Sequence, residues 1–319
     1  MKVFIAGATG VLGRRTVALC ADRGHDVVGL TRDSGGDRVV REHGGEPRRG
    51  DVLDRESVVD AATGSDVLVH AATKIPTDTN PDDEEWELND RVRREGAENL
   101  VAAAAEHDAD RVLLQSVVWL ARQPDGSRFD EGAEPHPDRS TQSALEAERI
   151  VTDGAETHGF EPVVLRGGYF YAPDTVHTKL FGEGLLDRRM PIIAGGLLGR
   201  DDAELSFVHV DDAASAFAAA VDGDATGTFH VVDDRPTTYA NFLQSFADEL
   251  DAPRPRRIPG WLGGLFIDAN MRRLLTEPMP TSNDRLREAF DWEPEYPTVD
   301  EGLAQVVSRW RATGEVVEA

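Results

Sequence analysis

The chain has 319 residues, enough for one large domain or two modest ones with a real core. Its 59 acidic residues exceed its 34 basic ones, for a formal net charge of −25, and such a surface repels nucleic acid and anionic membranes, so neither is expected as a partner. The single cysteine, Cys20, excludes an intramolecular disulfide, and no apolar run approaches the ~18 residues of a membrane span, so we expect a soluble, cytoplasmic protein.

The acidic excess is spread along the whole chain, and only three of the basic residues are lysines, namely Lys2, Lys74 and Lys179. In a salt-rich cytoplasm the Debye length falls to ~3 Å, which removes most of the self-repulsion of such a surface. We therefore interpret the composition as halophilic, with an ordinary acidic enzyme as the alternative.

The first predicted strand, at residues 3–7, runs directly into three glycines spaced G-x-x-G-x-x-G, and a helix-forming stretch follows. Gly7 allows the positive φ of a tight strand-to-helix turn, Gly10 lets the backbone approach a phosphate, and Gly13 lets the helix pack closely. The free N–H groups and the dipole of a helix N-terminus favour negative charge there. The pattern predicts a site for the pyrophosphate of a dinucleotide, formed by Gly7, Ala8, Thr9, Gly10, Val11, Leu12 and Gly13.

The second predicted strand, at residues 27–31, ends about twenty residues past the glycines, where the choice between NAD and NADP is made. Thr31 stands where a carboxylate would hold the ribose 2′-hydroxyl, and Arg32 suits a 2′-phosphate. We therefore predict NADP as the cofactor. NAD stays open, because the next residue, Asp33, can turn inward to hold the 2′-hydroxyl.

Further short apolar segments alternate with helical patterns, which is typical of a doubly wound parallel sheet. The strands are expected at 66–72, 111–117 and 162–168, with a helix over about 89–106 between the first two of them. Past Arg166 the alternation loosens into a strand and helix at 206–221, a strand at 228–232, and helices near 238–251 and 299–312. We predict an α/β fold with a Rossmann-type domain over residues 1–165, its sheet completed by about 205–235, and a smaller substrate lobe at 166–204 and 236–319.

Together these segments resemble the extended short-chain dehydrogenase/reductase superfamily, in its NAD(P)-dependent epimerase/dehydratase branch. The resemblance covers nearly the whole chain and rests on GATGVLG at 7–13, GDVLD at 50–54, DVLVHAAT at 66–73, EGAENLVAAA at 95–104, LLQS at 113–116, R-x-x-x-x-Y-x-P at 166–173 and FVHVDDAA at 207–214. It implies that Asp51 and Val52 hold the adenine. It also implies that the turn of Ala71, Ala72 and Thr73 lines the path of the ribose and nicotinamide.

The chain departs from this family where the usual catalytic pair is expected. Relatives carry Tyr-x-x-x-Lys, in which the lysine lowers the pKa of the tyrosine so that the phenol can act as acid or base. In this chain the two positions fall on Ser140 and Ala144, neither of which can transfer that proton. Ser116 does fall where relatives have the serine that hydrogen-bonds the substrate oxygen. The chain is therefore identified as an atypical member.

A replacement acid must come from elsewhere, and Tyr169 matches a position where relatives usually have an asparagine facing the substrate. A nearby cation would have to depress the pKa of this phenol, and Lys74 and Lys179 are the nearest candidates in the sequence. Tyr171 matches the commoner tyrosine of the same motif, which favours a structural role, and it completes the substrate-side set with the two lysines. No His, Cys, Asp or Glu set has the spacing of a metal site, so no metal is expected.

We therefore expect an NAD(P)-dependent oxidoreductase that acts on a small carbonyl or alcohol substrate, with Ser116 and Tyr169 holding or protonating the oxygen. A non-catalytic dinucleotide sensor or assembly protein, as in NmrA-like regulators, is the alternative that the missing pair favours. A nucleotide-sugar epimerase or dehydratase would keep the same fold. The resemblance also implies a homodimer that pairs through the helices at 89–106 and 141–157, with the candidate contacts Leu100, Val101, Leu145, Ile150 and Val151.

Overall fold

The computed structural model describes residues 1–76, 82–196, 198, 202–263 and 269–315, and within them seven strands form one sheet. In spatial order the strands are β11 (Gly227–Val231), β6 (Glu161–Gly167), β5 (Arg111–Val117), β4 (Val67–His70), β1 (Lys2–Ala6), β2 (Asp26–Thr31) and β3 (Glu46–Arg49). Every pair of neighbours is parallel. The order reverses between β1 and β4, which is the place where ligands bind in open sheets of this kind.

The predicted α/β fold with a doubly wound parallel sheet is confirmed, and the predicted strands of its first half form with ends shifted by at most a few residues. The edge strand β3 was not predicted. Its sequence, Glu-Pro-Arg-Arg, has no apolar alternation, and most of it is exposed, so only pairing with β2 makes it a strand.

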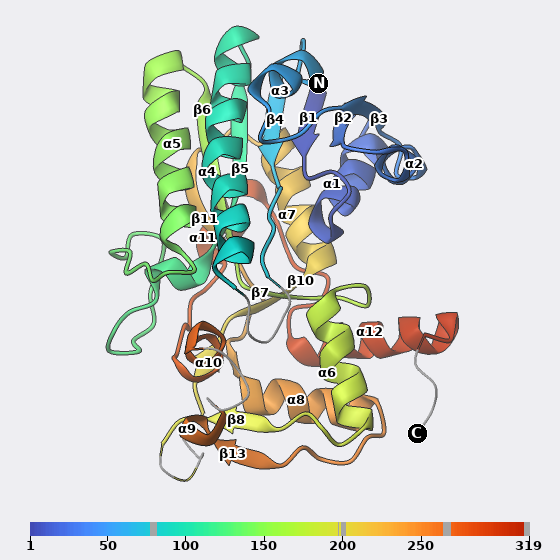
Figure 1. Ribbon diagram of the computed structural model, residues 1–319, viewed down its shortest axis with the longest axis vertical. Coiled ribbons are helices and arrows are strands. Elements are labelled where there is room, and N and C mark those ends of the chain that lie inside the picture. Colours follow the sequence, from blue (N-terminus) through green and yellow to red (C-terminus); the bar gives the residue numbers. More distant parts are fainter. Residues whose placement is uncertain (77–81, 197, 199–201, 264–268, 316–319) are drawn as a thin grey trace.

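Helices cover both faces of this sheet, as the upper half of Figure 1 shows. One face packs against α1 (Val11–Asp22), α2 (Ser34–Glu42), α7 (Val210–Asp222) and α11 (Asp284–Phe290). The other packs against α3 (Arg55–Ala61), α4 (Asp83–Glu106) and α5 (Gln142–His158). Helix α4 begins six residues before the predicted start, because the side chain of Asp82 caps it reciprocally with Glu85 and acidic residues fill its first turn.

The two helices that were expected to form a dimer contact, α4 and α5, pack against each other and against the sheet. Of the five candidate residues, Leu100, Leu145 and Val151 are buried within the single chain, whereas Val101 and Ile150 are partly exposed. A dimer contact on this face would therefore be made by the outer edge of the helix pair rather than by all five residues.

A second, smaller lobe lies below the sheet in Figure 1. Its strands pair as β7 (Tyr169–Tyr171) with β10 (Phe207–His209), β8 (Ile192–Ala194) with β13 (Arg257–Pro259), and β9 (Glu204–Leu205) with β12 (Thr237–Thr238). Its helices are α6 (Val176–Leu186), α8 (Tyr239–Glu249), α9 (Gly260–Gly263), α10 (Ala269–Thr276) and α12 (Val299–Thr313), and a short 3-10 helix, η1 (Val118–Ala121), follows β5.

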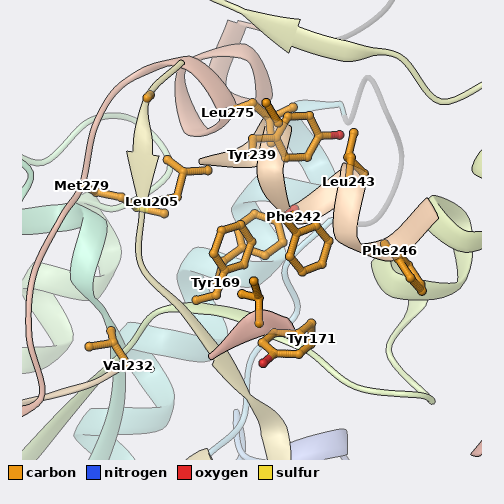
Figure 2. Close-up of a cluster of buried hydrophobic side chains, with 14 of the residues drawn as sticks. Tyr169, Tyr171, Leu205, Val232, Tyr239, Phe242, Leu243, Phe246, Leu275 and Met279 are labelled. Atoms are coloured by element: carbon orange, nitrogen blue, oxygen red, sulfur yellow. The ribbon is translucent and has the colours of Figure 1, made fainter. Parts of the chain in front are cut away.

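Aromatic side chains form the core of this lobe. Figure 2 shows Tyr169 and Tyr171 of β7 in one cluster with Tyr239 and Phe242 of α8. The rings of Phe242 and Phe207 stack with their centroids 4.6 Å apart. Because β7 follows β6 of the large sheet and β10 leads into α7 on that sheet, this cluster joins the lobe to the dinucleotide-binding half rather than standing apart from it.

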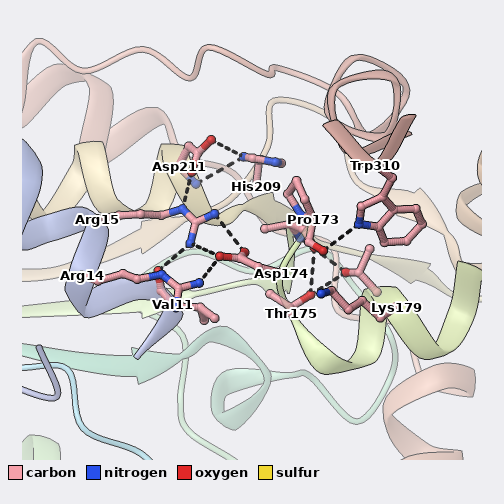
Figure 3. A network of polar contacts seen from close by, with 12 residues as sticks. Val11, Arg14, Arg15, Pro173, Asp174, Thr175, Lys179, His209, Asp211 and Trp310 are labelled. Carbon is pink, nitrogen blue, oxygen red and sulfur yellow. Dashed lines mark hydrogen bonds and ion pairs between the residues drawn. The ribbon is translucent and has the colours of Figure 1, made fainter. Parts of the chain in front are cut away.

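An ion-pair network also ties the lobe to α1 (Figure 3). Arg15 of α1 contacts Asp174 in the loop after β7, with Nη2 and Oδ1 2.9 Å apart, and it pairs with Asp211 in the first turn of α7. Arg14 also pairs with Asp174. These contacts hold the start of α1 against the lobe, and so fix the position of the glycine turn relative to it.

None of the helices described is long and apolar enough to cross a membrane.

Candidate active site

The turn between β1 and α1 has the geometry that the three glycines predict. Gly7 has a φ of +90°, and a Cβ there would lie 2.5 Å from the backbone of Ala71 at the end of β4. A Cβ on Gly13 would overlap the carbonyl of Gly7. Both positions therefore exclude any larger side chain, whereas Gly10 is less crowded, with its nearest atom 3.3 Å away.

The N-terminus of α1 is open to a ligand. The N-cap residue, Gly10, contributes no side-chain cap, and no acidic residue stands in the first turn. The N–H groups of this turn thus lack a side-chain acceptor, and the helix dipole adds positive potential. A narrow glycine turn below an uncapped helix fits the pyrophosphate of a dinucleotide, held by Gly7 to Gly13.

The tip of β2 has no free carboxylate directed at a ribose. Thr31 donates its hydroxyl to Asp37 at 2.6 Å, and Asp33 caps α2 by accepting the N–H of Gly36 at 2.8 Å. Arg32 is exposed, and Arg49 at the end of β3 donates to its carbonyl at 3.0 Å. The guanidinium of Arg49 is paired with Asp37, with Nη2 and Oδ2 2.8 Å apart.

The residues expected at the adenine lie in the turn after β3 and are held in place by α4. Asp51 accepts the N–H of Leu53 at 3.0 Å, and the side-chain amide of Asn99 donates to the carbonyl of Val52 at 2.8 Å. Neither side chain is fully buried. Both can therefore contact a ligand that runs along this edge.

The end of β4 leads from the glycine turn to a cavity. The N–H of Ala71 bonds the carbonyl of Ala6 at 2.9 Å, Ala72 and Thr73 are half-buried, and the chain then reaches Ile75 and Pro76, which form part of the cavity wall.

The cavity encloses about 150 Å³ between the carboxyl ends of β5 and β6 and the lobe. Much of its wall is aromatic, and the aromatic side chains are those of Trp86, Trp119, Tyr169, Phe170 and His177. Ser116, Ser140 and the pair Gly167 and Gly168 also line it. The sequence-predicted catalytic residues Ser116 and Tyr169 are thus brought to one cavity.

Ser116 is buried and already engaged. Its hydroxyl donates to Glu148 Oε1 at 2.5 Å, and the same carboxylate receives two hydrogen bonds from Arg166, at 2.9 and 2.7 Å. The pair of Glu148 and Arg166 therefore fixes the rotamer of Ser116. To donate to a substrate oxygen, the hydroxyl has to turn away from Glu148.

Tyr169 does not have the environment that the sequence suggested. Burial raises the pKa of its phenol, the opposite of the depression that a neighbouring lysine would cause. Its hydroxyl has no hydrogen-bond partner among the described residues, so it is available to a ligand. The phenol therefore stays protonated at neutral pH.

The structure does not bring either lysine to the cavity wall. Lys179 on α6 pairs with Glu315, with Nζ and Oε2 2.7 Å apart, in an exposed position, and the side chain of Lys74 is exposed. Tyr171 is buried in the lobe and donates to Asp233 at 3.2 Å. The substrate-side set of Lys74, Tyr171 and Lys179 is thus dispersed, since sequence proximity to the cleft does not determine which way a side chain points.

Several polar wall residues were not found by sequence reasoning. Arg93 of α4 donates from Nη1 to the carbonyl of Ser140 at 2.9 Å and to the hydroxyl of Ser143 at 3.3 Å. Arg122 pairs with Asp138, and both line the cavity. No local pattern distinguishes Arg93 from the other arginines of its helix, because only its burial against α5 does so.

Within the described residues, no group of three or more His, Cys, Asp or Glu side chains is placed to hold a metal ion. His70 is buried and bonds the carbonyl of Val92 at 3.2 Å, and burial lowers its pKa to about 4. It therefore remains neutral and has a structural role.

Comparison with known proteins agrees with this geometry. Residues 3–232 match the model of the NAD dependent epimerase/dehydratase family. Over 320 residues, 96% of this chain and all of the relative, the chain is 34% identical to the 3-diazoavenalumate denitrifying reductase of a Streptomyces species.

Two solved structures share the fold over nearly their whole length. The UDP-glucose 4-epimerase of Thermotoga maritima is 17% identical with a TM-score of 0.80, and covers 98% of this chain and 99% of its own. The Thermus thermophilus UDP-glucose 4-epimerase, solved with NAD, is 23% identical with a TM-score of 0.79 over the same shares. At these identities the similarity shows the fold alone.

Proposed function

Since the chain belongs to the NAD-dependent epimerase/dehydratase family and has an oxidoreductase function of the short-chain dehydrogenase/reductase type, we propose that it is an NADP-preferring reductase of a small molecule held in the cavity. One observation carries the proposal. Ser116, the Gly167–Gly168 step and Tyr169 line one cavity with Ile75 and Pro76, and these two residues follow shortly after Ala71, which lies against Gly7 of the glycine turn.

The nicotinamide dinucleotide, when bound, supplies a hydride. The chain's own residues orient the acceptor and exclude water. The aromatic wall covers a planar group, and Gly167 and Gly168 also line the cavity. For a carbonyl substrate, the hydroxyl of Tyr169 donates to the oxygen, and Ser116 gives a second hydrogen bond once it turns from Glu148.

A second candidate substrate class is a diazo compound. It is favoured by the full-length similarity to a denitrifying reductase of a diazo compound, together with the serine and alanine at positions 140 and 144. Carbonyl reduction requires a proton on the oxygen. Replacement of a diazonium group by hydride releases N₂ and forms a C–H bond, so it requires no protein acid. A site without the usual tyrosine and lysine suits that reaction.

Turnover with the two acceptor classes tests these proposals. NADPH oxidation would be followed at 340 nm in molar KCl with a panel of aromatic aldehydes and ketones and, separately, with 4-carboxybenzenediazonium, where headspace N₂ is measured against an enzyme-free control. We expect NADPH oxidation with one of the two acceptor classes. If NADPH binds but neither class is reduced, the protein is a non-catalytic sensor and the proposal fails.

We also propose that the protein is a homodimer formed through the outer edge of α4 and α5. The partly exposed Val101 and Ile150 of this helix pair support the proposal. Light scattering in molar KCl should give about twice the single-chain mass of 34.8 kDa, and the single-chain mass would contradict it.

A further inference from the structure

Arg93 is a buried cation on the wall of the cavity. It extends from α4 to the start of α5, where its guanidinium holds the carbonyl of Ser140, a residue that also lines the cavity. Burial lowers its pKa to about 10, so it is still charged at neutral pH. A guanidinium removed from water is stable only when its charge is balanced or its donors are used.

No carboxylate forms a hydrogen bond or ion pair with Arg93 among the described residues. Its hydrogen-bond acceptors among the described residues are neutral, a carbonyl and a hydroxyl. The charge of Asp90 favours the charged form of Arg93, but Asp90 bonds Arg139 through one oxygen, and its other oxygen is buried without a hydrogen-bond partner in the described residues. By contrast, Arg122, the other cation of the wall, pairs with Asp138 at 3.2 Å and with Glu277 at 3.3 Å.

The described part of the wall thus carries two cations, Arg93 and Arg122, against one carboxylate, Asp138. Arg122 is balanced by Asp138 and Glu277, so Arg93 is the wall cation that has no hydrogen-bonded carboxylate among the described residues, in a chain whose net charge is −25. A buried cation without a hydrogen-bonded carboxylate favours an anion as its partner in the cavity. His177 adds a second polar contact, because its buried Nε2 has no partner in the described residues.

The size and the surface of the cavity limit what the anion can be. A cavity of about 150 Å³ has room for a benzene ring, since enclosed protein cavities of ~150 Å³ bind benzene. Trp86 and Trp119 supply flat apolar surface from opposite elements, α4 and η1. The chemistry of the wall is therefore that of a site for a planar ring with an anionic group.

We propose that Arg93 is the specificity-determining residue of the cavity and that the substrate is an aromatic acid whose carboxylate it binds. This inference rests on the proposed reductase function but is tested by binding, without turnover. Arg93 touches the carboxylate and positions the ring, while the reacting group lies at the other end of the molecule, towards Ser116 and Tyr169.

The test compares two probes of the same shape. Calorimetry with the NADP-loaded protein, and with the protein alone, would measure 4-hydroxybenzoate against 4-hydroxybenzamide, which keeps the ring but lacks the charge. A charged hydrogen bond in a buried site should make the benzoate bind about 10-fold to 100-fold more tightly. Equal affinity for the two probes, or binding of neither, would overturn the proposal on the unmodified protein.

Variants assign the effect to Arg93. Arg93→Met should reduce the preference for the benzoate to less than about 3-fold, and Arg93→Lys should restore part of it. Arg94→Met is the matched control, because Arg94 is the next residue of the helix but pairs outside the cavity with Glu146 at 3.1 Å. The control should keep the full preference.

Failure of this inference and failure of the reductase function give different results. If the benzoate preference is lost in Arg93→Met but nothing is reduced, the site is confirmed and the reaction is wrong. If Arg93→Met keeps the preference, Arg93 is a structural clamp on Ser140 and the inference is wrong, whatever the activity. If Arg93→Met does not fold, the inference is tested by the affinities of the two probes for the unmodified protein and for Arg93→Lys.

Discussion

Arg166 on β6 and Glu148 on α5 form a buried ion pair, with the guanidinium bonded to both carboxylate oxygens at 2.9 and 2.7 Å. The same carboxylate accepts the hydroxyl of Ser116. A catalytic candidate is thus oriented by a pair that the sheet and a helix bring together. The Nη1 atom of Arg166 is buried without a partner among the described residues, so the pair is sensitive to any loss of charge balance.

Glu148→Ala should destabilise the fold by about 3–5 kcal/mol, because it leaves the Arg166 charge buried and unpaired. Urea unfolding in molar KCl measures this. Glu146→Ala, which removes the partly exposed partner of Arg94, is the control and should cost less than ~1 kcal/mol. An equal decrease in the free energy of unfolding in the two variants would contradict the larger contribution expected of the buried pair.

Cofactor choice is predicted from the tip of β2. The unmodified protein should bind NADP more tightly than NAD in calorimetry at molar KCl, because the exposed Arg32 can pair with a 2′-phosphate and Asp33 is used as a helix cap. Arg32→Ala should remove most of the difference, about 10-fold on the scale of one charged hydrogen bond. Tighter binding of NAD by the unmodified protein would refute the prediction.

Tyr169→Phe should lower kcat for a carbonyl substrate by roughly 10²-fold or more and leave NADP affinity unchanged, the loss expected for a missing proton donor. Because burial raises the pKa of this phenol, kcat should not fall as the pH rises through ~10, the ordinary pKa of tyrosine.

Tyr296→Phe is the matched control for that experiment, since Tyr296 bonds Glu295 and does not line the cavity. Its kcat should equal that of the unmodified protein. Unchanged turnover in Tyr169→Phe would place the proton donor elsewhere. If only a diazo compound is reduced, Tyr169→Phe should have little effect on that reaction, because it needs no acid.

Stability should depend on pH through Asp212. Burial, with the neighbouring carboxylates Glu295 and Asp211, raises the pKa of Asp212 to about 6. The folded state therefore keeps a proton that the unfolded state releases near pH ~4, so this group's contribution to stability falls as the pH rises from ~4 to ~6. The loss is about 2–3 kcal/mol.

Asp212→Asn replaces the carboxyl with an amide, which does not ionise in this range. The N–H groups of Glu295 and Tyr296 both bond Asp212, and the amide oxygen can still accept one of them. The free energy of unfolding of the variant, relative to that of the unmodified protein, should increase as the pH rises from 4 to 7. Urea unfolding measures both values. A constant difference over this range would contradict the expected titration.

The acidic composition predicts a dependence on salt. With 59 acidic residues in the chain, lowering the ionic strength from molar to 0.1 M lengthens the Debye distance from ~3 Å to ~10 Å and strengthens repulsion within the fold. The Tm should rise steeply between dilute buffer and molar KCl. A flat profile would leave the halophilic interpretation without support.

The glycine turn and the strands around it could be predicted because each is encoded by neighbouring residues. Gly7 needs its positive φ within a single turn, and the alternation of apolar strands and helices reads directly from the chain. Strand β3 could not be predicted, since its polar residues become a strand only by pairing with β2. The pKa of Tyr169 was expected to fall and instead rises, because no cation approaches it among the described residues and burial dominates.

The amino-acid sequence by itself determined the fold class, the family and the dinucleotide turn, because these depend on spacing over a few residues and on the apolar pattern of each element. Only the tertiary structure decided which polar groups share the cavity. Arg93 and Ser140 lie 47 residues apart, and Lys179 turns to Glu315 across 136 residues. Such contacts depend on how α4, α5 and α6 pack, and that packing sums many weak contacts that no local pattern records.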